Sequence, residues 1–334
     1  MIPQIKVKAQ SQRPWQNALK TALTDPRALL KALNLSSDAI PWTENNFGMK
    51  VPLSFVAKMK QGDPNDPLLR QVLPVKFESE QTDGFVPDPL AERLQNPLPG
   101  LIHKFKNRVL VIPATRCPIH CRYCFRRHFP YDENNINLSA FDNIADYIAK
   151  DNNIHEVILS GGDPLFAPDR YLQSVIEKMT ASEHIKILRF HTRFPITVPE
   201  RIDDSFLTLV KHIKVQVVMV LHCNHPNELC NDIKAAVTLL KAAGVTVLNQ
   251  SVLLKGINDN AETLIALSHR LFEHGIMPYY INQLDPIENT AHFEVPKEKI
   301  KELYADLLSN LPGYLVPRFV QEQAFKPNKI PLSI

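Results

Sequence analysis

Short apolar, β-branched segments recur from about residue 108 to residue 320, separated by polar stretches of helical character. The segments are Val109–Pro113, Val157–Ser160, Ile187–His191, Val215–His222, Val245–Leu254, Pro278–Leu284 and Tyr314–Val320. One intervening stretch has a clear helical period, because Leu229, Ile233, Val237 and Leu240 recur at helical spacing and Gly244 follows as a stop. This alternation predicts an α/β protein with a parallel sheet and crossover helices.

About six strands fit an open or partial (β/α)6 barrel, and a doubly wound sheet is the alternative. Chemically unusual residues favour the barrel, because they follow the C-terminal ends of successive strands, where barrels carry their active sites. They are a cysteine-rich segment after the first strand, then Ser160–Asp163, His191–Arg193, His222–His225, Asn249–Gln250 and Asn282–Asp285.

The first hundred residues have a different pattern. Asp25 and Pro26 begin a predicted helix that runs to Leu33, and residues 62–99 are rich in proline, which predicts extended or looped chain wrapped around another part. We therefore expect three parts: a helical and proline-rich wrapping segment at 1–100, a barrel at 101–312 and a short C-terminal segment at 313–334.

Composition narrows the class of protein. Of 334 residues, 44% are hydrophobic, which is enough for a large buried core, and no apolar run reaches the roughly 18 residues that span a membrane. The net charge of +3 is too small to predict a nucleic-acid or membrane-surface partner. Met1–Arg13 lacks the apolar stretch of a secretory signal, so we expect a cytoplasmic protein.

Three of the five cysteines fall within eight residues. Cys117, Cys121 and Cys124 have the spacing C-x3-C-x2-C, which predicts a shared metal or cluster in a reducing compartment. Three ligands around a 4Fe–4S cluster leave one iron open to a small molecule. The alternatives are a zinc site completed by His120 or His128, and buried protonated thiols.

This loop, with an aromatic residue before its last cysteine, resembles the signature of radical S-adenosylmethionine enzymes. Further segments resemble the lysine 2,3-aminomutase family, in the same order, from about residue 100 to 332. They are Cys121–Phe129, Ser160–Leu165, His222–Glu228, Asn249–Leu254, Pro278–Ile281 and Gly313–Pro317. The short C-terminus and Phe125–Tyr131 are most similar to the branch that makes (R)-β-lysine for elongation factor P.

The resemblance implies two cofactor sites. Cys117, Cys121 and Cys124 would hold the 4Fe–4S cluster, whose open iron binds S-adenosylmethionine. That cofactor would also meet Ser160, Gly161, Gly162, Asp163 and Gln250. An ordinary strand-to-loop turn and a buried strand amide are the alternatives for these residues.

Pyridoxal phosphate would form a Schiff base with Lys329, and Arg108 would meet its phosphate. The chain has no glycine run before Lys329, so Lys326 is a rival, and a solvated tail lysine is the remaining alternative.

The resemblance also implies a substrate site for lysine. Arg126 would bind the carboxylate, and Asp285 and Glu322 would bind the ε-ammonium group. An ion pair at the cluster rim and a turn-starting aspartate are the alternative interpretations of Arg126 and Asp285.

The function implied is conversion of (S)-α-lysine to (R)-β-lysine for β-lysylation of elongation factor P, with a lysyl ligase and an electron donor as partners. The rival functions are a free-lysine aminomutase of catabolism or β-lysine accumulation, and a zinc-stabilised binding protein without catalysis.

Other cysteines and histidines remain outside these sites. We interpret Cys223 and Cys230 as unreactive thiols. For His191, His222 and His225 the sequence allows either a contact with a cofactor or a structural role.

Overall fold

The computed structural model describes residues 13–43 and 47–332. Most of Met1–Arg13, from which we predict that a secretory signal is absent, lies outside the described residues. No helix in the described ranges combines the length and the apolar character needed to cross a bilayer.

The centre of the molecule is one sheet of nine strands that lie side by side in chain order. The strands are β1 (Leu101–Phe105), β2 (Arg108–Ala114), β3 (Glu156–Gly161), β4 (Ile187–Thr192), β5 (Gln216–His222), β6 (Thr246–Val252), β7 (Met277–Asn282), β8 (Arg318–Gln321) and β9 (Ile330–Pro331). Strands β2 to β8 are parallel, and β1 and β9 pair antiparallel at the two edges. A doubly wound sheet would reverse its strand order near the middle, so this strictly consecutive order confirms the partial barrel.

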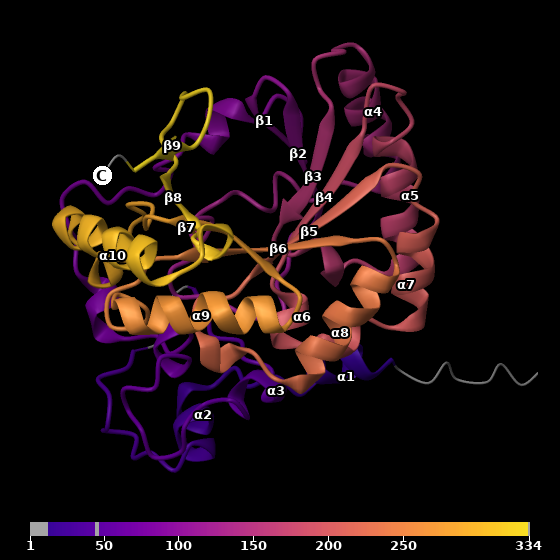
Figure 1. Cartoon of the computed structure of the whole chain (residues 1–334). Coiled ribbons are helices and arrows are strands. Elements are labelled where there is room, and N and C mark those ends of the chain that lie inside the picture. The colour runs from indigo at the N-terminus through magenta and orange to yellow at the C-terminus, as the bar shows by residue number, and fades with distance from the viewer. Residues whose placement is uncertain (1–12, 44–46, 333–334) are drawn as a thin grey trace, which may run out of the picture.

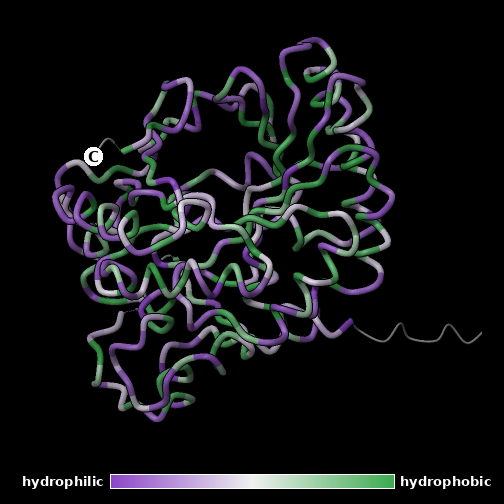
Figure 2. Tube along the Cα trace, viewed as in Figure 1, coloured by the Kyte–Doolittle hydropathy of each residue, from purple (hydrophilic) through white to green (hydrophobic). Residues whose placement is uncertain are grey.

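Helices connect the parallel strands and lie outside the curved sheet (Figure 1). They are α4 (Phe141–Ala149), α5 (Asp169–Met179), α6 (Phe194–Thr197), α7 (Asp204–Lys211), α8 (Asn231–Ala242), α9 (Ala261–Glu273) and α10 (Lys297–Asn310). The largest hydrophobic cluster joins strand residues such as Leu159, Phe190 and Leu221 to the inner faces of α4 to α9. Figure 2 shows the same division, with hydrophobic strands and mostly polar outer turns.

The N-terminal segment packs beneath one end of this barrel (Figure 1). Its helices are α1 (Pro14–Lys20), α2 (Pro26–Ala32) and α3 (Leu53–Val56), and its proline-rich part forms turns and short 3-10 helices at Leu69–Gln71, Lys76–Ser79 and Glu92–Gln95. As predicted, the Asp25 side chain caps the helix that begins at Pro26. A separate hydrophobic cluster, which includes Leu29, Phe55 and Leu68, also takes in Ile119 of the cysteine loop.

The structure differs from the predicted strands in three places. The predicted strand Tyr314–Val320 begins instead as the 3-10 helix Gly313–Leu315, because Pro312 and Pro317 interrupt the ladder on either side. Strands β1 and β9 are absent from the prediction, since the first carries polar residues at its end and the second has only two residues, one of them proline.

A buried carboxylate ties the N-terminal segment to the cysteine loop. Glu78 is 1% exposed and accepts hydrogen bonds from Arg122 Nε at 2.8 Å and from Arg127 Nη2 at 2.9 Å. The ring of Phe47 also lies near both guanidinium groups, 5.0 Å from that of Arg122 and 4.7 Å from that of Arg127. Removing the charge of Glu78 would leave two arginines buried without their carboxylate.

We therefore expect Glu78→Gln to lower the free energy of unfolding by about 3–5 kcal/mol, the usual cost of breaking a buried ion pair. Urea denaturation followed by circular dichroism measures this change. Glu80→Gln is the matched control, because Glu80 is exposed on the same segment and should change stability little. Equal effects of the two substitutions would contradict this role of Glu78.

Candidate active site

A cavity of about 760 Å³ runs inside the curved sheet, from the cysteine loop to the first residues of the strands. All of the predicted site residues line it, whereas the rival Lys326 is exposed and lies outside its lining. The lining includes Cys117, Cys121, Cys124, Arg108, Arg126, Ser160, Gly161, Gly162, Asp163, Gln250, Asp285, Glu322 and Lys329. The structure thus brings together residues that span more than two hundred positions of the sequence.

The three cysteines of the loop between β2 and α4 face one end of this cavity. Burial, followed by the nearby Cys121, raises the pKa of the Cys124 thiol to about 11. Such clustered thiols become thiolates readily only when a cation binds among them. The donor set therefore fits an iron–sulfur cluster.

Both histidines of the zinc alternative have other neighbours in the structure. Among the described residues, no three His, Cys, Asp or Glu side chains converge as ligands of a single ion. Each cysteine of a 4Fe–4S cluster binds a different iron, so its sulfurs need no common point. His120 bonds through Nδ1 to the Gly48 carbonyl at 2.7 Å, and His128 lies 3.8 Å from Glu288.

A polar network that our sequence analysis did not predict lies against the loop. Arg193, directly after β4, donates from Nη1 to Cys121 Sγ at 2.7 Å and from Nη2 to Glu228 at 2.9 Å. Gln71 of the N-terminal segment accepts a hydrogen bond from the same Nη2 at 2.7 Å and another from the Tyr123 hydroxyl at 3.2 Å. The sequence marks the segments that contain Arg193 and Glu228, but no motif connects them to Gln71 of the N-terminal segment.

The glycine pair after β3 packs against the chain that leads into the cysteine loop. A Cβ atom at Gly162 would lie 2.6 Å from the Arg116 carbonyl oxygen, and one at Gly161 would lie 2.5 Å from Ile112. Gly161 also has a φ of +109°, which other residues rarely adopt. The pair therefore permits a close backbone approach that sets the position of the loop.

Asp163 holds the end of β3 to the end of β4. Its carboxylate accepts hydrogen bonds from the Thr192 hydroxyl at 2.7 Å, the Arg193 amide at 2.8 Å and the Leu165 amide at 3.1 Å. Burial raises its pKa to about 6 even though these bonds favour the charged form. The turn that is predicted to meet S-adenosylmethionine is therefore held in place by contacts within the protein.

A line of buried charges crosses the cavity wall. Arg126 forms two bonds to Glu92, at 2.7 and 2.8 Å, and a third to Ser160 at 3.2 Å. Lys104 of β1 bonds to Glu92 at 2.8 Å and also pairs with Glu322, just after β8. Burial alone would raise the pKa of Glu92, but Arg126 and Lys104 lower it to about 2.

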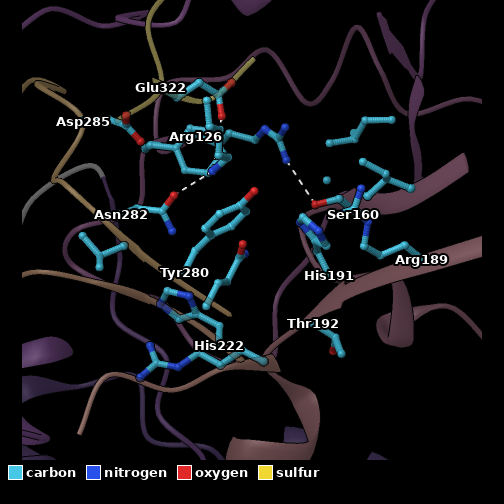
Figure 3. Close-up of a pocket in the computed structure, with 18 of the residues that line it drawn as sticks. Arg126, Ser160, Arg189, His191, Thr192, His222, Tyr280, Asn282, Asp285 and Glu322 are labelled. Carbon is cyan, nitrogen blue, oxygen red and sulfur yellow. Dashed lines mark hydrogen bonds and ion pairs between the residues drawn. The ribbon is translucent and has the colours of Figure 1, made fainter. Parts of the chain in front are cut away.

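Lys329 continues this line next to β9. Its Nζ donates to Asn282 at 2.7 Å, lies 3.4 Å from Glu322 and stands 5.6 Å from the centre of the Tyr280 ring. Figure 3 shows Asn282, Asp285 and Glu322 on the same side of the cavity.

Asp285 also lines the cavity, but unlike Glu92 and Glu322 its carboxylate is unpaired among the described residues. No hydrogen bond or ion pair engages its carboxylate within residues 13–43 and 47–332. Burial, together with Glu322, raises its pKa to about 7, and Lys329 and Lys104 only partly oppose this shift. A cation that binds next to Asp285 would therefore stabilise its ionised form.

The other end of the cavity is positively charged. Arg108 begins β2, and Arg189 lies in β4 and pairs with Glu156 at 2.5 Å. Burial, followed by repulsion from Arg189, lowers the pKa of Arg108. The Arg189 Nε atom is buried without a hydrogen-bond partner among the described residues. Of these two guanidinium groups only that of Arg189 has an ion pair among the described residues, and together they fit a multiply charged anion such as a phosphate.

The histidines that the sequence left open fall into two groups. His191 and His222 line the cavity, and His225 does not. His222 bonds to the Tyr123 hydroxyl at 2.9 Å, and burial lowers its pKa to about 3, so it is neutral. His225 caps the turn that begins at Pro226, which is a structural role.

An open parallel barrel with a three-cysteine loop at its mouth is the arrangement of radical S-adenosylmethionine enzymes. In agreement, residues 111–267 match the model of the Radical SAM superfamily. The chain is 44% identical over 332 residues to L-lysine 2,3-aminomutase of Haemophilus influenzae, covering 98% of each chain. It is 41% identical to that of Escherichia coli over 328 residues, covering 97% and 96%. The Clostridium subterminale enzyme is 34% identical over 322 residues, covering 95% of this chain and 77% of its own. The chain therefore belongs to the lysine 2,3-aminomutase family.

The close approach at the glycine pair can be tested. We expect Gly162→Ala to destabilise the protein by about 1–3 kcal/mol, the usual cost of inserting an atom into packed surroundings, because its neighbours are backbone atoms. Gly313→Ala is the control, since no described atom lies within 4 Å of the point that its Cβ would occupy. Urea denaturation compares the two, and equal midpoints would contradict the packing argument.

Proposed function

We propose that this protein converts (S)-α-lysine to (R)-β-lysine by moving the amino group from carbon 2 to carbon 3. The observation that carries the proposal is the order of side chains along one cavity: three cysteines at one end, a lysine and two acids in the wall, and two arginines at the other end. A non-catalytic zinc protein would have no use for this order. The assignment agrees with the family to which the chain belongs.

The cofactors follow from the residues that fit them. We propose that Cys117, Cys121 and Cys124 hold the 4Fe–4S cluster of the superfamily, and that Lys329 holds pyridoxal phosphate. When bound, the cluster with S-adenosylmethionine supplies a carbon radical that removes hydrogen from the substrate, and pyridoxal phosphate carries the migrating amino group. The protein's own task is to place these groups in contact and to exclude water.

The space beside the cysteines is bordered by the C-terminal ends of β3 and β6. We propose that Ser160, the Gly161 and Gly162 backbone and Gln250 border bound S-adenosylmethionine there. Asp163 already satisfies its carboxylate within the protein, so we propose that it shapes this turn and does not bind the ligand through its side chain.

Lys329 is suited to hold a second cofactor because β9 fixes the backbone next to it, while Asn282 and Glu322 orient its amino group. Tyr280 presents a ring beneath that amino group. Arg108 and Arg189 lie at the end of the same cavity and fit the phosphate.

We expect Lys329→Ala to abolish covalent attachment of pyridoxal phosphate, since no other lysine of the described chain except Lys104 lines the cavity. Borohydride reduction followed by peptide mass spectrometry locates the modified lysine. Lys326→Ala is the matched control, because this lysine is exposed three positions earlier and should keep wild-type attachment. Modification of Lys326 in the wild type would overturn the assignment.

The charges of the cavity residues match those of the two ends of lysine. Lysine has a carboxylate, which suits the guanidinium of Arg126, and a distal ammonium group, which suits two acids. Among the described residues, the Asp285 carboxylate has no hydrogen-bond or ion-pair partner, whereas Glu322 already contacts Lys104 and Lys329. We propose that Asp285 and Glu322 together bind the ε-ammonium group, and that Asp285 ionises as it does so.

This role predicts a pH dependence. The carboxyl of Asp285 has a pKa of about 7, set by burial, Glu322, Lys329, Lys104 and Glu92. Below pH 7 it is neutral and binds an ammonium group less well, so KM for lysine should rise as the pH falls from 8 to 6. In Asp285→Asn, KM should be at least about tenfold higher and flat over this range, because a charged hydrogen bond of about 1.5–3 kcal/mol is lost.

The measurement is initial rates of β-lysine formation under anaerobic conditions with S-adenosylmethionine, pyridoxal phosphate, a reductant and isotopically labelled lysine. Asp306→Asn, an exposed acid on α10, should behave as wild type. A pH profile of KM that is identical in wild type and Asp285→Asn would rule out this role. Chiral analysis of the same product tests the reaction itself, and the absence of (R)-β-lysine would overturn the proposed function.

We propose elongation factor P as the destination of the product, through a lysyl ligase that attaches (R)-β-lysine to it. The similarity of Phe125–Tyr131 to the elongation factor P branch supports this choice over a catabolic role. Labelled product that the ligase transfers to elongation factor P would support it. Accumulation of free β-lysine without transfer would favour the catabolic alternative.

A further inference from the structure

Arg193 places a buried positive charge directly against one cysteine of the loop. The residue is 5% exposed, follows β4, and its Nη1 lies 2.7 Å from Cys121 Sγ. Its guanidinium also stands 5.3 Å from the Phe55 ring and 5.8 Å from the Tyr123 ring.

The charge of Arg193 is held in a fixed direction. Nη2 faces Glu228 at 2.9 Å and Gln71 at 2.7 Å, and these contacts leave Nη1 aimed at the sulfur. Glu228 is 0% exposed and is itself fixed by the backbone amides of Asn224 at 2.9 Å and His225 at 3.1 Å. One carboxylate therefore balances the guanidinium at the end remote from Cys121.

We propose that Arg193 raises the reduction potential of the 4Fe–4S cluster by donating a hydrogen bond and presenting positive charge to the Cys121 thiolate, and that Glu228 moderates this effect. Hydrogen bonds to cluster sulfurs and nearby charge are established determinants of cluster potential. A reduced cluster carries one more negative charge than an oxidised one, so a fixed cation beside its ligand stabilises the reduced state. Arg193 is then a positioning and tuning residue, and this inference rests on the cluster assignment made above.

The test is a potentiometric titration of the reconstituted, full-length protein, followed by electron paramagnetic resonance of the reduced cluster. Arg193→Gln removes the charge and should lower the midpoint potential. We expect about a tenfold fall in the ratio of reduced to oxidised cluster at a fixed potential, which is about 59 mV for one electron. Arg193→Lys keeps the charge and should shift the potential less.

Glu228→Gln should shift the midpoint potential of the cluster in the opposite direction. It removes the negative charge behind Arg193 and should raise the midpoint potential. Arg201→Gln is the matched control, because Arg201 is also a fully buried arginine paired with a carboxylate, at 2.7 Å from Asp169, and lies outside the cavity lining. It should leave the potential unchanged while it tests the general effect of losing a buried arginine.

A merely structural role predicts a different pattern. Loosening the loop would move the potential in the same direction in Arg193→Gln and Glu228→Gln, and either that pattern or an unchanged potential in Arg193→Gln overturns the proposal. If Arg193→Gln retains no cluster, the rise or its absence in Glu228→Gln decides the question. A wild-type protein without an iron–sulfur spectrum would instead contradict the proposed function.

Discussion

The active site depends on an ion pair between strands from opposite ends of an open sheet. Lys104 lies on the edge strand β1, and Glu322 directly follows β8, which lies beside the other edge strand, so their contact links strands that form no ladder with each other. Buried charges are costly unless they are paired, and each partner here comes from a different end of the sheet. The same ammonium group also contacts Glu92, which holds Arg126. The positions of the groups proposed to bind the two ends of lysine are therefore coupled through one continuous set of charges.

The N-terminal segment supplies the second constraint. Gln71 contacts Arg193, which bonds to Cys121, and Glu78 contacts Arg122 and Arg127, so this segment supports the cysteine loop and the arginine beside it. A loop of small turns has few backbone hydrogen bonds of its own, and buried polar partners are what hold such a segment in one conformation. The segment is thus part of the site although none of its residues belongs to a recognisable motif.

The sequence predicted the six β2-to-β7 strands and the cysteine loop well, because hydrophobic alternation and cysteine spacing are local signals. It did not predict β1 or β9, which owe their strand conformation to pairing at an edge. Nor did it predict Glu92, Lys104 or the contact of Arg193 with Cys121, since an ordinary charged residue becomes informative only when the fold gives it a partner. The resemblance places Asp163 at the cofactor, and the structure adds internal hydrogen bonds of its carboxylate that the sequence of the turn alone does not indicate.

The position of Lys329 on the last edge of the sheet has a consequence for biosynthesis. The cavity draws on side chains from Leu90 to Pro331, and β9 can pair only with a β8 that already exists. A ribosome delivers the cysteine loop long before it delivers this lysine. The cavity can close only after Lys329 has emerged, so the organic cofactor that is proposed to bind there would be loaded after the cysteine loop has been made.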